Sequence, residues 1–308
     1  MSSLKEIIKK NKPDISVSSV DTYISNINST GKKVGVVFKT VEDIIDNADK
    51  IFDSMKDLKT NTRKSKLASF IVVLDCVNPT KKTKDILTKF REQMNKDLVT
   101  IKDKDTSQEL TEIQKENFVP WKEVLNLYHI LEVEAKPLLN LKSLTQKHFQ
   151  KLSDYILMGL YTEIPPRRSL DYTAFKIKNI DEKEDNFLKV GKGSYKLIFN
   201  KYKNSSRLGP QVVDLPLAFG KTLKKFIDKN PYDWLIVNKV GKPVLQSYIA
   251  KVLNRLFDKH ASSSMLRHSY LTHKFGNVDL KDLEETTKDM GNSQVSRTLA
   301  YVSKDNVK

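Results

Sequence analysis

The sequence predicts a mainly helical protein with a small antiparallel β-sheet in its second half. Apolar residues recur at helical spacing through most of the first hundred residues, short β-rich runs flank a turn at 191–194, and helical spacing returns after Pro216. The chain has 308 residues, of which 39% are hydrophobic, so it can bury a core in each of two domains. We therefore expect a two-domain protein of the α+β class.

The first half divides into a basic tail at residues 1–12 and a helical domain at residues 13–105. The segment 106–117 is polar and has no apolar periodicity, which is typical of a linker. A second domain then spans residues 118–308. The expected helices are 17–27, 41–55, 64–77, 81–102, 121–135, 144–161, 217–228, 244–259, 264–275, 280–290 and 293–302. The expected strands are 172–180, 187–190, 195–200 and 211–215.

The charge balance favours a polyanionic partner. Lys and Arg number 54 against 38 Asp and Glu, a formal charge of +16, and neutralising phosphates releases their condensed counterions. Only eight of the basic residues are Arg. Because the planar guanidinium binds phosphate in a bidentate way that Lys cannot, we expect some of these few arginines to lie where phosphate is recognised.

Several other classes of protein are disfavoured. The single cysteine, Cys76, allows no disulfide framework and indicates a reducing compartment. No stretch approaches the roughly 18 apolar residues of a membrane span, and the N-terminus lacks a secretory apolar segment. Residues 220–222 resemble the end of a phosphate-binding loop, but Leu215 occupies the place of its first glycine. No metal-binding motif is visible. We expect an intracellular protein with no membrane contact, metal or other cofactor.

The second domain contains four groups of residues in a characteristic order. The first is residues 165–172, where Arg168 precedes Asp171 by three positions. The second is residues 200–207, in the β-rich region. The third begins with capping serines and continues as Leu266, Arg267, His268 and Ser269, and the last is residues 290–293 followed by Tyr301.

This ordered set resembles the motifs of the tyrosine recombinase family, which includes phage integrases and recombinases of virophages, large DNA viruses and related mobile elements. The resemblance implies a catalytic domain in residues 118–308 and a DNA core-binding domain in residues 13–105. It assigns catalysis to Arg168, Lys203, Arg267, Asn292 and Tyr301, and motif positions near the site to Ser264, His268 and Asp171. Arg167 is an alternative to Arg168, and Lys201 is an alternative to Lys203.

The family cleaves and rejoins double-stranded DNA through a 3′-phosphotyrosine, without metal or ATP. The resemblance therefore implies a site-specific recombinase that acts at DNA, with a homo-tetramer on paired sites as one possible assembly. Two other functions remain. A type IB topoisomerase shares this chemistry, and a catalytically reduced DNA-binding protein would explain Ser264 and Asn292, which stand where the family usually has other residues. Neither side chain titrates near neutral pH.

A basic helix start at residues 60–66 precedes an apolar helix in the first domain. Such a helix start is suited to contacts with phosphates or bases. The predicted DNA contacts are therefore Arg63, Lys64 and Lys66, together with Arg167 of the second domain.

Overall fold

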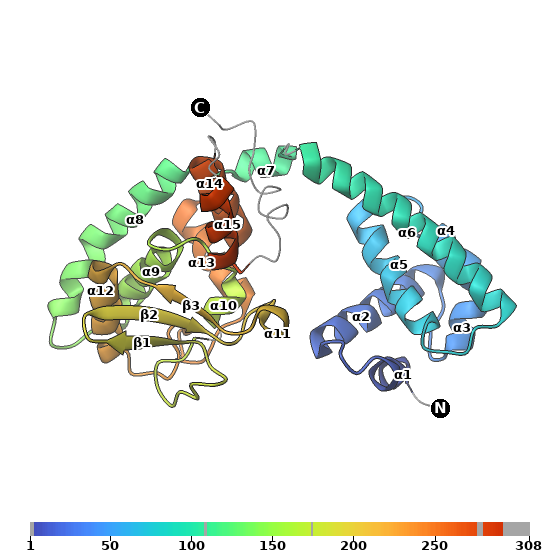
Figure 1. Cartoon of the computed structure of the whole chain (residues 1–308), viewed down its shortest axis with the longest axis horizontal. Helices are drawn as coiled ribbons and strands as arrows, with labels where there is room; N and C mark the ends of the chain where they lie inside the picture. The colour runs from blue at the N-terminus through green and yellow to red at the C-terminus, as the bar shows by residue number, and fades with distance from the viewer. Residues whose placement is uncertain (1–2, 108–109, 174, 276–279, 292–308) are drawn as a thin grey trace. The chain divides into compact units, whose positions relative to one another are not determined.

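The computed structural model describes residues 3–107, 110–173, 175–275 and 280–291 (Figure 1). They form helices and a three-stranded antiparallel sheet, which confirms the α+β prediction. The chain divides into two compact units, Met1–Ser107 and Gln108–Lys308. This boundary lies within the predicted linker at 106–117, although part of that segment forms the short helix α7, Glu112–Asn117.

The first unit is helical. Its elements are α1 (Leu4–Asn11), α2 (Val17–Val34), α3 (Val41–Asp46), α4 (Ala48–Asp53), α5 (Thr60–Leu74) and α6 (Lys81–Ser107). The prediction of a basic tail at residues 1–12 is wrong, because Ser3 and Glu6 form a capping box that starts α1. One face of α1 is also apolar, and Ile8 is fully buried in the core of the unit.

Helix α5 passes through the middle of the first unit's core. Leu67, Phe70 and Leu74 on this helix are all fully buried. The ring of Phe70 meets those of Phe38 and Phe90 edge to face, at centroid distances of 5.8 and 6.4 Å. These contacts join α5 to α6 and to the segment before α3, so the unit has a core of its own.

The second unit combines helices with the sheet. Its elements are α7, α8 (Trp121–Ala135), the 3₁₀ helix η1 (Lys136–Asn140), α9 (Gln146–Thr162), α10 (Ser169–Thr173), β1 (Phe187–Gly191), β2 (Ser194–Phe199), α11 (Ser205–Leu208), β3 (Gln211–Asp214), α12 (Leu217–Lys229), α13 (Gln246–Phe257), α14 (Ser263–Phe275) and α15 (Leu280–Asp289). The strand order is β1-β2-β3, with both pairs antiparallel.

One predicted strand, at 172–180, is wrong. Its first residues belong to α10, and Phe175 and Lys176 form only isolated bridges, to Asn186 and Trp234. Tyr172 and Phe175 are fully buried, so the apolar pattern does report burial there, but on a helix followed by irregular chain. The predicted helix at 293–302 lies outside the described residues.

Helix α9 forms the centre of the second unit's core, with every residue from Asp154 to Tyr161 buried. At Gly159 a side chain would clash, because a Cβ atom there would lie 2.2 Å from the ring of Phe219 on α12. The glycine therefore allows α9 and α12 to approach closely. Helix α12 in turn packs on β2, and α9 leads directly to the predicted arginines of the second unit.

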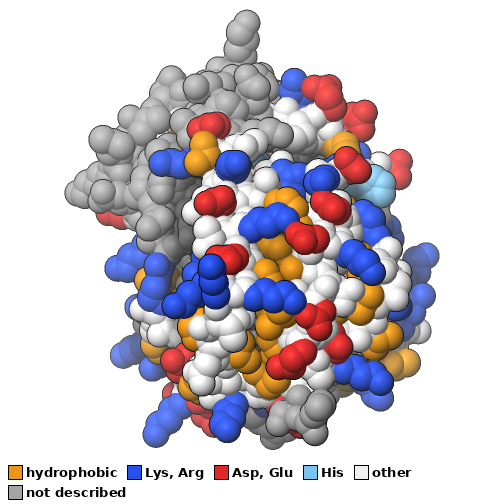
Figure 2. All heavy atoms as spheres, turned by 90° about the vertical axis from the view of Figure 1, so that its right-hand side faces the viewer, with side chains coloured by type: hydrophobic (Ala, Val, Ile, Leu, Met, Phe, Trp, Pro, Cys, Tyr) orange, Lys and Arg blue, Asp and Glu red, His pale blue; other side chains and the backbone are white. Residues whose placement is uncertain are grey.

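The surface carries both signs of charge. Figure 2 shows one face of the molecule, on which basic and acidic side chains are mixed around apolar ones. Among the described helices, none combines the length and the apolar character required to cross a membrane.

Candidate active site

Arg167 and Arg168 lie between α9 and α10, directly after two prolines. The prolines keep this segment extended, and α10 begins at Ser169, so Asp171 points back toward the arginines. Arg267 comes from the second turn of α14 and is only 1% exposed. Two segments that are far apart in the sequence thus meet at one place in the second unit.

The buried carboxylate of Asp171 is the centre of this cluster. Arg167 Nε donates to Asp171 Oδ2 at 2.9 Å, and both side chains are at most 1% exposed. Burial raises the pKa of Asp171, and the guanidinium groups of Arg167, Arg168 and Arg267 oppose this rise in that order. The charges of all three arginines therefore stabilise the ionised form of the same carboxylate.

The ion-pair partner of Asp171 is not the arginine that the motif spacing selects. That spacing selects Arg168, three residues before Asp171, as the catalytic arginine. In the structure Arg167, four residues before it, forms the ion pair, whereas Arg168 Nη1 lies 3.4 Å from the carbonyl oxygen of Gly291. The two neighbouring arginines therefore point to different partners.

The prediction that Arg167 contacts DNA is also corrected. Its guanidinium is fully buried, lies 4.0 Å from the ring centroid of Phe199 and 5.3 Å from that of Tyr202, and donates to the carbonyl oxygen of Asp289 at 2.5 Å. Two of its donors, Nε and Nη1, are thus directed at Asp171 and Asp289 rather than at the surface. Arg168 is half-buried instead.

Both candidate lysines lie in the connection between β2 and β3. Lys203 is exposed, and Lys201 Nζ lies 3.5 Å from Asp185 Oδ1. Between them Tyr202 is buried and donates its hydroxyl proton to the carbonyl oxygen of Gly209 at 2.7 Å. This bond fixes the connection while both lysine side chains point away from the core.

Asn186 is a structural link that the sequence reasoning missed. It is fully buried, and its Nδ2 donates to the carbonyl oxygens of Asp171 (2.8 Å) and Lys201 (2.7 Å). Its Oδ1 accepts the backbone N–H of Lys201 at 2.7 Å. The amide thus joins the arginine cluster to the start of the lysine-bearing connection. No sequence motif marks it, because its partners are backbone groups.

The remaining predicted residues are only partly covered by the structure. Ser264 is exposed on the first turn of α14, and His268 is half-buried on the turn that carries Arg267. Asn292 and Tyr301 lie outside the described residues. Within the described ranges, no three His, Cys, Asp or Glu side chains are grouped as metal ligands would be.

In the first unit, Arg63 holds two helices together. Its Nε and Nη2 donate to Asp97 on α6 at 2.9 and 2.6 Å, and its Nη1 donates to the carbonyl oxygens of Lys56 and Leu58. The guanidinium of Arg63 is thus paired with buried Asp97, and its DNA contact stays a prediction.

Lys64 and Lys66 differ from Arg63. Lys64 is half-buried on α5. Lys66 Nζ donates to the hydroxyls of Ser29 (2.6 Å) and Thr30 (3.0 Å) on α2. Burial lowers the pKa of Lys66, and the nearby charge of Lys33 lowers it further. The ammonium groups of Lys66 and Lys33 therefore lie near each other in the first unit.

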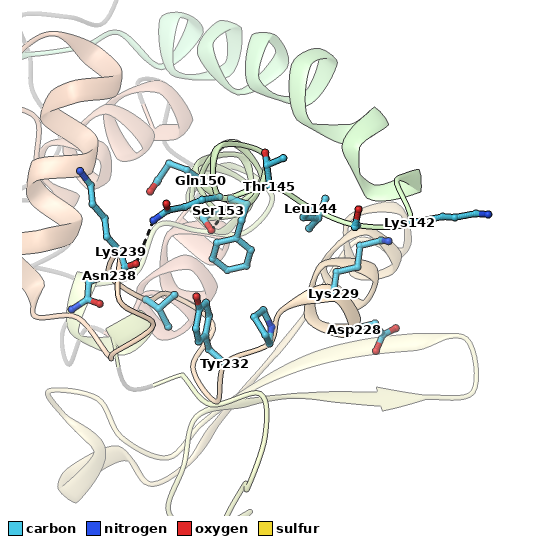
Figure 3. A pocket seen from close by; sticks show the side chains of 15 residues that line it. Lys142, Leu144, Thr145, Gln150, Ser153, Asp228, Lys229, Tyr232, Asn238 and Lys239 are labelled. Carbon is cyan, nitrogen blue, oxygen red and sulfur yellow. Dashed lines mark hydrogen bonds between the residues drawn. The ribbon is translucent and has the colours of Figure 1, made fainter.

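A cavity of about 630 Å³ lies elsewhere in the second unit (Figure 3). It is formed by the start of α9, the end of α12 and residues 231–239. Gln146 donates across it to the carbonyl oxygen of Lys239 at 3.4 Å. The arginines follow the other end of α9, a helix of 17 residues and so roughly 25 Å long. The cavity is therefore separate from the arginine cluster.

A scan against protein-family models and a search of curated proteins give no match to this chain. The family resemblance therefore rests on the sequence motifs.

Proposed function

We propose that this protein is a site-specific DNA recombinase of the tyrosine recombinase class. The observation that carries the proposal is that Arg168 and Arg267, from segments far apart in the sequence, both lie close enough to buried Asp171 for their charges to lower its pKa. Two guanidinium groups at one place can stabilise the negative charge that builds up on the non-bridging oxygens of a phosphodiester under attack. The exposed Lys203 on the nearby connection supports the same assignment.

The proposed reaction has two steps. The hydroxyl of Tyr301 loses its proton to solvent as its oxygen attacks phosphorus; a bond forms between them, and the bond from phosphorus to the 5′ oxygen breaks. Lys203 gives its proton to that leaving oxygen, and Arg168 and Arg267 hold the charged phosphoryl oxygens. Asn292 donates a further hydrogen bond. In the second step a 5′ hydroxyl gives its proton to Lys203 and attacks phosphorus, and the bond from phosphorus to the Tyr301 oxygen breaks. Tyr301 regains a proton from solvent, and rejoining requires no ATP because the phosphotyrosine conserves the energy of the original bond.

The test is covalent capture of DNA in EDTA and without ATP. A library of nicked duplexes with randomised flanks is incubated with the full chain, because the target sequence is unknown. The nick lets the short downstream strand diffuse away, which traps the phosphotyrosine. We expect a covalent adduct that maps to the peptide containing Tyr301 and is absent from Tyr301→Phe. No adduct with any duplex, or an adduct on another residue, overturns the proposal.

Tyr270→Phe is the matched control. Tyr270 is a half-buried tyrosine on the Arg267 helix, and its ring packs edge to face on Trp121 at 5.2 Å. This variant should form the adduct at the wild-type rate. Relaxation of supercoiled plasmid with no exchange between paired sites would identify a type IB topoisomerase instead.

A further inference from the structure

The C-terminal end of α15 is held by side chains from other segments. Arg167 Nη1 donates to the carbonyl oxygen of Asp289 at 2.5 Å, and Gln211 Nε2 donates to that of Lys288 at 2.9 Å. Asn204 Nδ2 donates to the carbonyl oxygen of Gly291 at 2.6 Å. The last carbonyls of a helix have no partners within it. We call Arg167, Asn204 and Gln211 the α15 clamp.

Gly291 adds a second constraint at the same place. Its φ of +65° is left-handed, a conformation that ends many helices and favours glycine. A Cβ atom there would lie 3.3 Å from Arg167 Nη2, 3.4 Å from Gln211 Oε1 and 3.5 Å from the Tyr202 ring. The chain therefore turns at Gly291 in close contact with the clamp, and the positive φ makes any other residue there strained.

Two of the clamp residues, Arg167 and Gln211, are themselves held by further contacts. Arg167 is fully buried between its ion pair with Asp171 and the ring of Phe199. Gln211 begins β3 and pairs with Phe199 of β2. A helix end bound by such groups has little freedom to shift.

The clamp residues are close in sequence to the groups proposed for chemistry. Arg167 precedes Arg168, and Asn204 follows Lys203. After Gly291 the sequence continues to Asn292 and Tyr301. One set of hydrogen bonds therefore connects two segments with the start of a third. The two segments carry Arg168 and the proposed proton donor Lys203, and the third leads to the proposed nucleophile Tyr301.

We propose that Asn204 and Gln211, together with Arg167, are positioning residues that fix the end of α15 relative to Arg168 and Lys203. This inference rests on the proposed recombinase function for its catalytic consequence. The claim that these three residues restrain the end of α15 does not depend on that function. Small displacements of reacting groups cost large factors in rate, so the clamp should affect the cleavage step rather than DNA binding.

The test uses variants of almost unchanged shape in the full chain. Asn204→Asp and Gln211→Glu replace an amide donor with a carboxylate, which cannot donate to a carbonyl and repels it. Asn200→Asp is the matched control. Asn200 Nδ2 also donates to two backbone carbonyls, those of Glu182 and Asp185, but these are not part of α15.

The first measurement is hydrogen–deuterium exchange, which requires no activity. The amides of Met290 and Gly291 donate to Thr286 and Lys288 within the held turn, each at 2.9 Å. Each clamp variant should speed exchange at these amides about tenfold, and Asn200→Asp should leave it unchanged. Unchanged exchange in both clamp variants overturns the clamp, whether or not the protein cleaves DNA.

The second measurement is the single-turnover rate of adduct formation beside DNA affinity. Both clamp variants should cleave about tenfold more slowly or worse, with Kd within twofold of wild type, and Asn200→Asp should cleave at the wild-type rate. Faster exchange with an unchanged cleavage rate overturns the positioning role, as does an equal loss in Asn200→Asp. Absence of an adduct from the wild type rejects the recombinase instead, while the exchange result still decides the clamp.

Discussion

Arg167 and Arg168 are neighbours with different surroundings. Arg167 is enclosed by Asp171, Phe199 and the end of α15, whereas Arg168 is half-buried, with its Nη1 3.4 Å from the carbonyl oxygen of Gly291. A buried arginine paired with a buried carboxylate cannot be removed without leaving the carboxylate uncompensated. We therefore distinguish a structural role of Arg167 from the proposed catalytic role of Arg168.

This separation predicts a difference in stability. Arg167→Ala should lower the free energy of unfolding by about 3–5 kcal/mol, because Asp171 would keep a buried charge without its ion-pair partner. Arg168→Ala should lower it by about 1 kcal/mol or less, as expected for a partly exposed side chain. Urea denaturation of the wild type, Arg167→Ala and Arg168→Ala measures both changes in the free energy of unfolding. Equal losses in the two variants would contradict the assignment.

For catalysis the prediction concerns Arg168 and Arg267. Arg168→Ala and Arg267→Ala should each slow adduct formation about 10²–10³-fold, the usual cost of losing one donor to a transition-state oxyanion. DNA affinity should change little, since it is spread over many phosphate contacts. Single-turnover cleavage and a binding titration are compared at one salt concentration. Parallel losses of affinity and rate would show that these arginines only bind DNA.

The choice between Lys203 and Lys201 can be decided by the leaving group. Lys201 faces Asp185, whereas Lys203 is exposed, so we expect Lys203→Ala to cleave slowly and Lys201→Ala to cleave normally. A substrate with sulfur in place of the 5′ bridging oxygen leaves as a thiolate and requires no proton, because thiols have pKa values near 8.5. This substrate should restore cleavage by Lys203→Ala. Failure of rescue would exclude a proton donor at this position.

At the scale of elements, the sequence predicted regular structure better than irregular structure. The predicted helix at 121–135 coincides with α8, since Pro120 marks its start and apolar spacing continues to Ala135. The turn at 191–194 correctly joined two strands. The prediction was wrong at 172–180 because alternating burial there comes from α10 and irregular chain.

The candidate site was predictable where residue type carried the signal. The arginines were found because the chain has few of them and they fall in ordered motifs. Arg167 could not be separated from Arg168, since side chains three and four residues before Asp171 lie on the same side of a helix start. Asn186, Asn204 and Gln211 could not be found, because their partners are backbone carbonyls of distant segments.

The start of α3 gives a prediction of pH dependence. The carboxylate of Asp43 accepts the backbone N–H groups of Thr40 and Lys39, each at 2.8 Å, and these bonds lower its pKa. A carboxylate with a lowered pKa in the folded state contributes stability above its unfolded value of about 4. This contribution is lost as pH falls through the folded value. Urea midpoints between pH 2 and 7 should fall less steeply in Asp43→Asn than in wild type, and identical slopes would contradict the capping role.

For the whole molecule, the positive charge is shared by both units. Residues 1–107 contain 21 basic and 15 acidic residues, and residues 108–308 contain 33 and 23, so the formal charges are +6 and +10. Some of this charge is paired locally. Lys82 and Lys89 on α6 form ion pairs with Asp46 and Asp49 at 2.8 and 2.7 Å. The net charge therefore does not identify which lysines contact a polyanion.

Salt dependence of DNA binding distinguishes these lysines. The logarithm of the binding constant falls with the logarithm of salt concentration, by about 0.9 for each phosphate neutralised on duplex DNA. We expect Lys64→Ala and Lys66→Ala each to reduce the slope by about 0.9, because these side chains lie at the basic start of α5. Lys82→Ala is the control, because it removes one positive charge from the same unit. The ammonium of Lys82 is already paired with Asp46, so the slope of this variant should equal the wild-type slope. Equal reductions of the slope in all three variants would show that DNA binding responds to net charge alone. A wild-type slope near zero would show that the +16 charge does not serve nucleic-acid binding.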